Sequence, residues 1–231
     1  MRLIAAAAVL LPALLIGLLT VPADAASVRL DGVTVRLRPG TSQVVTANRT
    51  HGYHARVTLW VREHGRWTKR FSTSDGRIGY GGLSRSTQRH QGDGTTPAGT
   101  FDLPFAFGTH HRRPGWDMAY HRIRSGDYWV GDNSSRFYNK LRNKAAGGFR
   151  WWLPESDDNG SERLLAHRSQ YEYAFATGFN AEQVRHRGFA IFLHVNGRGA
   201  TAGCVSAPRS FLQMLYRRLS PQHHPVIAIG A

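Results

Sequence analysis

The stretch FLHVNGRGATAGCVSAP, residues 192–208, decides how this chain is interpreted. It contains Cys204, the only cysteine among the 231 residues, and His194 lies ten positions before it. The apolar run that ends at His194 is typical of a buried strand, and the glycines between the two residues allow the chain to turn back tightly. The sequence therefore predicts that His194 lies where a strand leaves the core, and that a loop leads from it to Cys204.

A single cysteine cannot form a disulfide within the chain, so its thiol is either a small buried apolar group or a reactive one. The residues after Cys204 predict a helix that begins near Ser206–Pro208, and a thiol at a helix N-terminus is shifted toward thiolate. An imidazole within hydrogen-bond reach can take the thiol proton. Backbone N–H groups at Gly203 and Cys204 are suited to stabilise an oxyanion. The local pattern thus predicts a Cys–His nucleophile pair, with a bland buried thiol as the alternative.

Residues 1–25, MRLIAAAAVLLPALLIGLLTVPADA, have the pattern of a secretory signal peptide. A positive Arg2 precedes a long apolar stretch, and an Ala-Asp-Ala cleavage site closes it. An uncleaved membrane anchor is the alternative, which a proline and a glycine inside the apolar stretch weaken. We therefore predict that residues 26–231 are the mature, exported protein, and that it touches the membrane only transiently through the signal peptide.

The chain carries 30 Lys and Arg against 15 Asp and Glu, a formal net charge of +15. A charge of this sign attracts polyanions such as nucleic acids, acidic wall polymers or anionic lipids. Nucleic acid is the least available of these to an exported protein, so we predict no nucleic-acid partner. Acidic wall polymers are a possible partner of the basic surface. The bland alternative is that scattered arginines only keep a monomeric protein soluble.

Short alternating apolar runs predict a protein rich in β-structure. Residues 27–37 contain two such runs around Asp31-Gly32, a dipeptide that favours a type I′ hairpin turn. Residues 55–71 repeat the pattern around His64-Gly65. Residues 72–100 are rich in Gly, Ser and Thr and are predicted to be loop. These patterns indicate a loop-rich β protein.

One convincing helix follows the cysteine. Pro208 suits a first helical turn, and the apolar residues that recur every four positions after it are Phe211, Leu215 and Leu219. The closing run PVIAIG predicts a last strand. No repeat, linker or change of composition divides the chain. The sequence therefore predicts one mostly β domain over residues 26–231.

Three stretches together resemble the L,D-transpeptidase (YkuD-type) family of bacterial cell-wall enzymes. The active-site segment of that family has a histidine at a strand end, a spacer, and Ser/Thr-His-Gly-Cys followed by Asn, Arg or Ser. In IFLHVNGRGATAGCVSAP the matching positions are His194, Thr201, Gly203, Cys204 and Ser206. GDGTTPAGTFDLP matches at Thr96, Pro97, Gly99 and Phe101, and YWVGDNSSRFYN matches at Trp129, Asp132, Tyr138 and Asn139. The ordered set is more specific than any one stretch.

The resemblance implies a YkuD-like β-sandwich or barrel with one helix after the catalytic cysteine. It implies that Cys204 attacks a peptidoglycan stem peptide, that His194 is the base, and that the carbonyl of Val195 orients the imidazole. The oxyanion site would use the N–H groups of Gly203 and Cys204, and no cofactor is implied. The substrate-binding residues would be Thr201, Ser206, Trp129, Tyr138 and Asn139, although packing in the β core is the alternative for the aromatic rings.

Two departures from the family pattern leave the reaction open. Ala202 stands where most members carry a second histidine, and the spacer between His194 and Cys204 is short. The alternatives to cross-linking are an L,D-carboxypeptidase or endopeptidase that uses the same pair, and a catalytically silent, cationic wall-binding module. The twelve histidines show no spacing typical of a closed metal site, so we predict no structural zinc.

Overall fold

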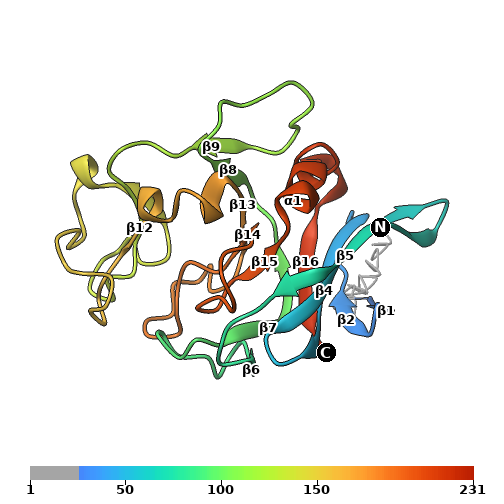
Figure 1. Ribbon diagram of the computed structural model, residues 1–231, viewed down its shortest axis with the longest axis horizontal. Helices are drawn as coiled ribbons and strands as arrows, with labels where there is room; N and C mark the ends of the chain where they lie inside the picture. The colour runs from blue at the N-terminus through green and yellow to red at the C-terminus, as the bar shows by residue number, and fades with distance from the viewer. Residues whose placement is uncertain (1–25) are drawn as a thin grey trace, which may run out of the picture.

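The computed structural model describes residues 26–231 (Figure 1). The predicted signal peptide, residues 1–25, lies outside the described residues. Within the described part of the chain, no helix has both the length and the apolar character needed to cross a bilayer.

One mixed sheet of eleven strands forms the body of the protein. In sheet order its strands are β6 (Leu83–Arg85), β7 (Thr96–Asp102), β16 (Val226–Gly230), β3 (Gln43–His51), β4 (His54–Glu63), β5 (Arg66–Arg77), β15 (Val205–Ala207), β14 (Phe192–Val195), β13 (Tyr173–Ala176), β8 (Ala106–Gly108) and β9 (Tyr120–Arg122). The smaller sheets are the hairpin β1 (Ser27–Leu30) and β2 (Val33–Arg36), and β11 (Leu141–Asn143), β10 (Asp127–Trp129) and β12 (Glu162–Arg163). The prediction of a mostly β fold is confirmed.

The two halves of the main sheet share one apolar core. Ile227 of β16 and Val45 of β3 lie in the same buried cluster as Tyr173 and Phe175 of β13. Strands so far apart in the sheet order can share a core only if the sheet curls so that its halves face each other. The curl brings β14 and β15 onto the wall of the core.

Both predicted hairpin turns are confirmed. Asp31 and Gly32 have φ values of 53° and 82°, and His64 and Gly65 have φ values of 48° and 80°. A type I′ turn requires a positive φ at both central residues, which matches the right-handed twist of the flanking strands. Local sequence therefore determines these two turns.

The prediction that residues 72–100 are loop is wrong in part. β5 continues to Arg77, and β6 and the start of β7 also lie in this segment. β7 pairs with the last strand of the chain, with Phe101 opposite Ile227, and Thr96 is fully buried. A Gly- and Thr-rich segment forms a strand here because partners distant in the sequence complete its hydrogen bonds.

The one α-helix within residues 26–231, α1 (Arg209–Tyr216), has Pro208 as its N-cap residue. Four short 3₁₀-helices occur in the described residues, namely η1 (Lys144–Ala146), η2 (Leu164–His167), η3 (Gln170–Glu172) and η4 (Pro221–His223). Helix α1 buries Phe211, Leu212, Leu215 and Tyr216 against the main core. The predicted apolar face is confirmed at Phe211 and Leu215, whereas Leu219 is buried beyond the end of the helix.

The hydroxyl of Tyr216 connects α1 to the sheet, and its loss is expected to destabilise the fold. It donates to the carbonyl of Phe107 at 2.6 Å and accepts from the N–H of Ala174 at 3.0 Å. Tyr216→Phe leaves that buried N–H without its partner, which costs about 1–3 kcal/mol. Urea unfolding measures this loss. Tyr173→Phe is the control, because the hydroxyl of this buried tyrosine has only a 3.3 Å contact from Gln213. Equal losses in the two variants contradict the assignment.

Candidate active site

The register of two neighbouring strands places His194 and Cys204 on one face of the sheet. β14 and β15 run parallel, with Leu193 opposite Val205 and His194 opposite Ser206. Leu193 and Val205 both point into the main core. Because side chains alternate between the two faces of a strand, His194 and Cys204 point to the other face. The pairing thus places both side chains on the same face of the sheet, where they line one pocket.

Cys204 lies at the start of β15 with its sulfur almost enclosed. The residue is 8% exposed. Its thiol donates to the carbonyl of Ala190 at 3.2 Å, and the N–H of Phe192 donates to the sulfur at 3.3 Å. The second contact favours negative charge on the sulfur, because an N–H group stabilises a thiolate more than a thiol.

His194 is buried at the end of β14 and is oriented by its own backbone. Its Nδ1 lies 2.8 Å from the carbonyl oxygen of Val195, the contact that the family resemblance implies. A carbonyl only accepts, so Nδ1 carries the proton and Nε2 is left as the basic nitrogen. The ring of Tyr171 meets the imidazole edge-on, with ring centroids 5.4 Å apart. These contacts hold the imidazole in one orientation.

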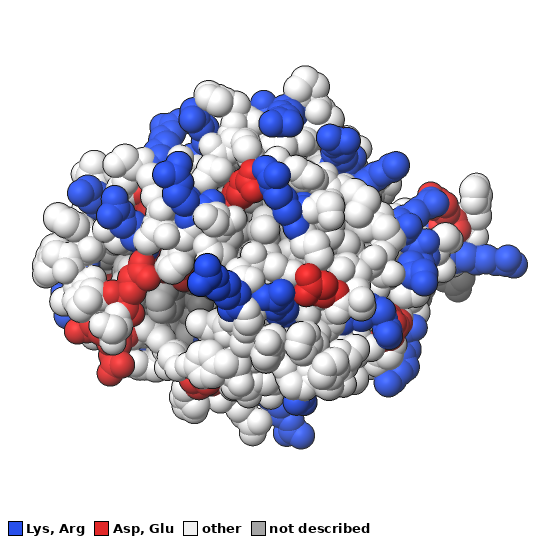
Figure 2. Space-filling model, viewed as in Figure 1, with Lys and Arg blue, Asp and Glu red and all other residues white. Residues whose placement is uncertain are grey.

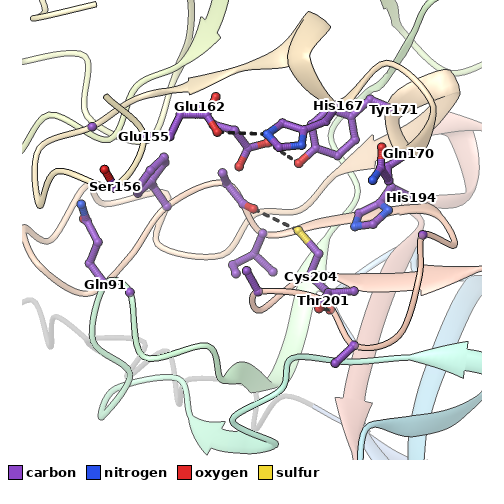
Figure 3. Close-up of a pocket in the computed structure, with 18 of the residues that line it drawn as sticks. Gln91, Glu155, Ser156, Glu162, His167, Gln170, Tyr171, His194, Thr201 and Cys204 are labelled. Atoms are coloured by element: carbon purple, nitrogen blue, oxygen red, sulfur yellow. Dashed lines mark hydrogen bonds and ion pairs between the residues drawn. The ribbon is translucent and has the colours of Figure 1, made fainter. Parts of the chain in front are cut away.

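Both residues line a pocket of about 530 Å³. Figure 3 shows the thiol of Cys204 and the imidazole of His194 on one side of this pocket, and Glu155 and Glu162 across from the thiol. The acidic residues that line the pocket are Glu155, Asp157, Asp158 and Glu162. Glu162 accepts a hydrogen bond from the hydroxyl of Tyr171. The pocket therefore combines a thiol, an imidazole and a wall of acidic side chains.

Burial keeps both members of the pair neutral at rest. Burial, with a smaller contribution from the charge of Glu162, raises the pKa of the Cys204 thiol to about 12. Burial also lowers the pKa of His194 to about 4. The thiol and the imidazole are therefore both neutral across the physiological range.

The predicted role of a helix N-terminus at Cys204 is wrong. Strand β15 follows the cysteine directly, and α1 begins only at Arg209. The influence of a helix dipole is confined to its first turn, so it does not reach this thiol. The apolar run after Cys204 pairs with β14 as a strand before the chain can become helical. The groups that lower the thiol pKa are instead the N–H of Phe192 and the guanidinium of Arg89.

The loop before the cysteine is held by Thr201. Its hydroxyl donates to the carbonyl of Cys204 at 2.7 Å and accepts from the N–H of Gly203 at 3.2 Å. Gly203 has a φ of 134°, and a Cβ there would lie 2.9 Å from the carbonyl oxygen of Thr95. Of the two N–H groups predicted for an oxyanion site, that of Gly203 is therefore already used within the loop. Ala202, where most family members carry a histidine, lies exposed on the pocket wall.

The structure does not bring four predicted substrate-binding residues to the pocket wall. Trp129, Tyr138, Asn139 and Ser206 are all buried, and their polar groups bond to other protein atoms. Asn139 accepts from the indole N–H of Trp129 at 2.7 Å and from the N–H of Ala190 at 3.2 Å. Because Ala190 in turn accepts from the Cys204 thiol, these residues support the segment that positions the nucleophile.

Several residues of the pocket are missed by sequence reasoning. They are Arg89, Glu162, His167 and Tyr171, which come from segments far from the cysteine in the sequence. None of them stands in a motif whose spacing indicates a site. Within residues 26–231, no three His, Cys, Asp or Glu side chains are arranged to hold a metal ion.

The buried carboxyl of Glu162 is expected to make stability depend on pH. Burial raises its pKa from 4.5 to about 7, so the folded protein keeps a proton that the unfolded chain releases between these values. This contribution is complete below pH 4.5 and is lost as the pH rises through 7. The free energy of unfolding of Glu162→Gln, relative to that of the wild type, should therefore rise by up to about 3 kcal/mol between about pH 4.5 and pH 8.

Urea unfolding of the two proteins at several pH values measures this gain. Glu155→Gln is the matched control, because a hydrogen bond from His167 lowers the pKa of Glu155. The difference in unfolding free energy between Glu155→Gln and wild type should change in the opposite direction as Glu155 titrates. A Glu162→Gln difference that stays constant with pH contradicts the assignment.

Comparisons with known proteins show what this chain is similar to. Among proteins of curated function, none matches the sequence. The solved structures with a similar fold include the helical cell shape determining protein Pgp2 from Campylobacter jejuni, with 14% identity over 81% of this chain and 47% of its own, and a TM-score of 0.43.

L,D-transpeptidase 1 from Mycobacterium tuberculosis has 10% identity over 82% of this chain and 62% of its own, with a TM-score of 0.35. An L,D-transpeptidase from Mycobacterium smegmatis has 13% identity over 89% of this chain and 66% of its own, with a TM-score of 0.39. The chain thus spans about half to two thirds of the length of these proteins. At such low similarity they add no argument about the site.

The family of this chain is shown by a match between its sequence and the model of one domain family. The YkuD family, described as the L,D-transpeptidase catalytic domain, matches residues 42–227. This range contains β14, β15 and the connecting loop, as well as nearly all of the main sheet. Because the match covers most of the chain, this protein belongs to the YkuD family of L,D-transpeptidase catalytic domains.

Proposed function

We propose that this chain is an exported cysteine acyltransferase that cross-links peptidoglycan stem peptides. The family acts on peptidoglycan. The observation that carries the proposal is that Cys204 and His194 line one pocket while Val195 binds Nδ1 of the imidazole. This arrangement leaves Nε2 of His194 as the base for the thiol.

In the first half of the reaction, the Cys204 sulfur attacks a carbonyl carbon of the donor stem, at a bond from an L-centre to a D-centre. The thiol proton passes to Nε2 of His194, and the carbonyl oxygen becomes an oxyanion. The N–H of Cys204, together with that of Gly203 once it leaves Thr201, stabilises this charge. The tetrahedral intermediate collapses to a thioester, and the imidazolium returns its proton to the departing amine, which leaves as D-alanine.

In the second half, the amine of a neighbouring stem attacks the thioester. His194 takes a proton from this amine and gives it to the sulfur as the thiol leaves. The net result is one peptide bond broken and one formed. Because the resting thiol has a pKa of about 12 and the resting imidazole a pKa of about 4, charge develops during attack and is absent before it.

The surface charge suits a protein that works on an acidic wall. Figure 2 shows basic side chains spread over the whole visible face, with acidic ones gathered mainly toward the left, where Figure 1 places β12 and its neighbouring loops. A net charge of +15 draws the protein to anionic polymers. Such attraction raises the local concentration of the enzyme at the wall without specifying a binding partner.

The two members of the pair are expected to differ in their effect on cross-linking. Cys204→Ala should abolish turnover, because no thioester can form. His194→Gln should reduce the rate by about 10²–10⁴-fold, which is the usual contribution of a general base. Incubation with tetrapeptide muropeptides, followed by mass spectrometry, measures the dimers formed. His51→Gln, a change at an exposed position of β3, is the control and should keep the wild-type rate.

Two outcomes of this experiment contradict cross-linking. If the wild type yields only trimmed monomers, water resolves the thioester and the protein is an L,D-carboxypeptidase. If the wild type yields no product and forms no covalent adduct at Cys204, the wall-binding alternative holds.

The protonation state of the pair predicts how Cys204 reacts with an alkylating reagent. With a thiol pKa of about 12, the rate with iodoacetamide should rise about tenfold per pH unit from pH 7 to pH 10 without reaching a plateau. Free cysteine, which levels off near its pKa of about 8.5, is the control. A plateau below about pH 7 indicates a preformed thiolate–imidazolium pair and contradicts this mechanism.

A further inference from the structure

A buried guanidinium lies beside the residue that precedes the nucleophile, and no step of the proposed reaction uses it. Arg89 stands between β6 and β7, is 4% exposed, and lines the same pocket as Cys204. Two glycines leave room for it. A Cβ at Gly188 would lie 1.6 Å from Nη1, and a Cβ at Gly203 would lie 2.8 Å from Nη2. The backbone is therefore shaped around this side chain.

The charge of Arg89 is held firmly but is only partly compensated. Nε donates to the carbonyl of Thr95 at 2.8 Å, and Nη1 donates to the carbonyl of Arg187 at 3.2 Å. Asp93 approaches Nε only to 3.9 Å, and its oxygens accept from Thr95 and His90 instead. Within residues 26–231, Nη2 donates to no protein atom.

A cation in this position is costly without a partner. Burial opposes the charged form and lowers the pKa of Arg89, although a guanidinium remains charged at neutral pH. A buried charge that is held in place, with donors left over beside the nucleophile, fits a site that an anion completes. A carboxylate matches the planar donors of a guanidinium best.

We propose that Nη2 of Arg89 binds the free α-carboxylate of the residue that leaves when Cys204 attacks. This inference rests on the proposed function. In a peptide, that carboxylate carbon is three bonds from the carbonyl carbon under attack. A donor next to Gly203 is therefore at the right end of the pocket to reach it. The substrate class is a peptide that ends one residue after the scissile bond.

The acidic side chains on the opposite wall of the pocket favour one orientation of the bound peptide. Figure 3 shows Glu155 and Glu162 across the pocket from Cys204. The hydrogen bond from His167 lowers the pKa of Glu155, so this carboxylate is ionised and repels a carboxylate at its own end, while Arg89 attracts it at the other. A peptide whose chain continues past the leaving residue, or whose end is amidated, loses the ion pair and leaves Arg89 unpaired. The pocket thus selects chain ends over internal bonds.

Matched donor peptides test this selection. The wild type should process a donor ending in a free acid about 10- to 100-fold faster, in kcat/KM, than the same donor ending in an amide. Arg89→Gln should abolish this preference, so that kcat/KM falls about 10- to 100-fold more on the acid than on the amide. Arg198→Gln is the control, because Arg198 also lines the pocket but is exposed, and it should keep the preference.

Two results overturn the proposal. One is an equal loss on both donors in Arg89→Gln, which means that Arg89 stabilises the oxyanion common to the two. The other is a wild type that processes acid and amide alike. The second comparison needs no variant, so it decides the question even if Arg89→Gln does not fold.

A binding measurement separates this inference from the proposed reaction. In Cys204→Ala, calorimetry should find that an N-acetylated dipeptide ending in D-alanine binds about tenfold more tightly than its amide. If neither donor turns over in wild type but the acid still binds more tightly than the amide, the proposed reaction is wrong and the carboxylate site at Arg89 is supported. Equal binding of acid and amide overturns the carboxylate site, whether or not the donors react.

Discussion

The parallel pairing of β14 with β15 is the contact on which the candidate site depends. Parallel neighbours are usually joined by a crossover of a dozen or more residues, often a helix. Here residues 196–204 suffice, and they return the chain so that Val205 lies opposite Leu193. Since a shift of one residue would turn every side chain to the other face, this register decides that the thiol meets the pocket and not the core.

The core side of the same pairing supplies the energy that holds the register. Leu193, Val195, Val205 and Ala207 are buried with residues of β4 and α1 in the main cluster. Burial of apolar side chains contributes about 25 cal/mol per Å², so a displaced register would expose much of this surface at a large cost. The positions of the thiol and the imidazole are therefore fixed by the burial of apolar residues on the other face of the two strands.

Burial also determines the protonation state of the candidate pair. A site enclosed by Phe192, Ala190 and Tyr171 disfavours charge, so the thiol and the imidazole rest in their neutral forms. The same enclosure strengthens the interaction of the sulfur with the N–H of Phe192 and with Arg89. Asn139, which matches a family motif, stabilises this enclosure through Ala190 and does not line the pocket.

The local sequence by itself determined the hairpin turns at Asp31-Gly32 and His64-Gly65 and the apolar face of α1, and it singled out Cys204 and His194 as a candidate pair. These features depend on backbone preferences and on short spacings, which a sequence displays directly. Family membership also follows from ordered motifs along the chain.

Only the tertiary structure decided the strands within residues 72–100, the pocket residues Arg89 and Glu162, and the direction of the thiol pKa shift. Each of these depends on what lies beside a residue in space: β16 beside β7, or an enclosing wall around the sulfur. Desolvation and hydrogen-bond pairing act over a few ångströms between segments far apart in the chain, so no local pattern records them.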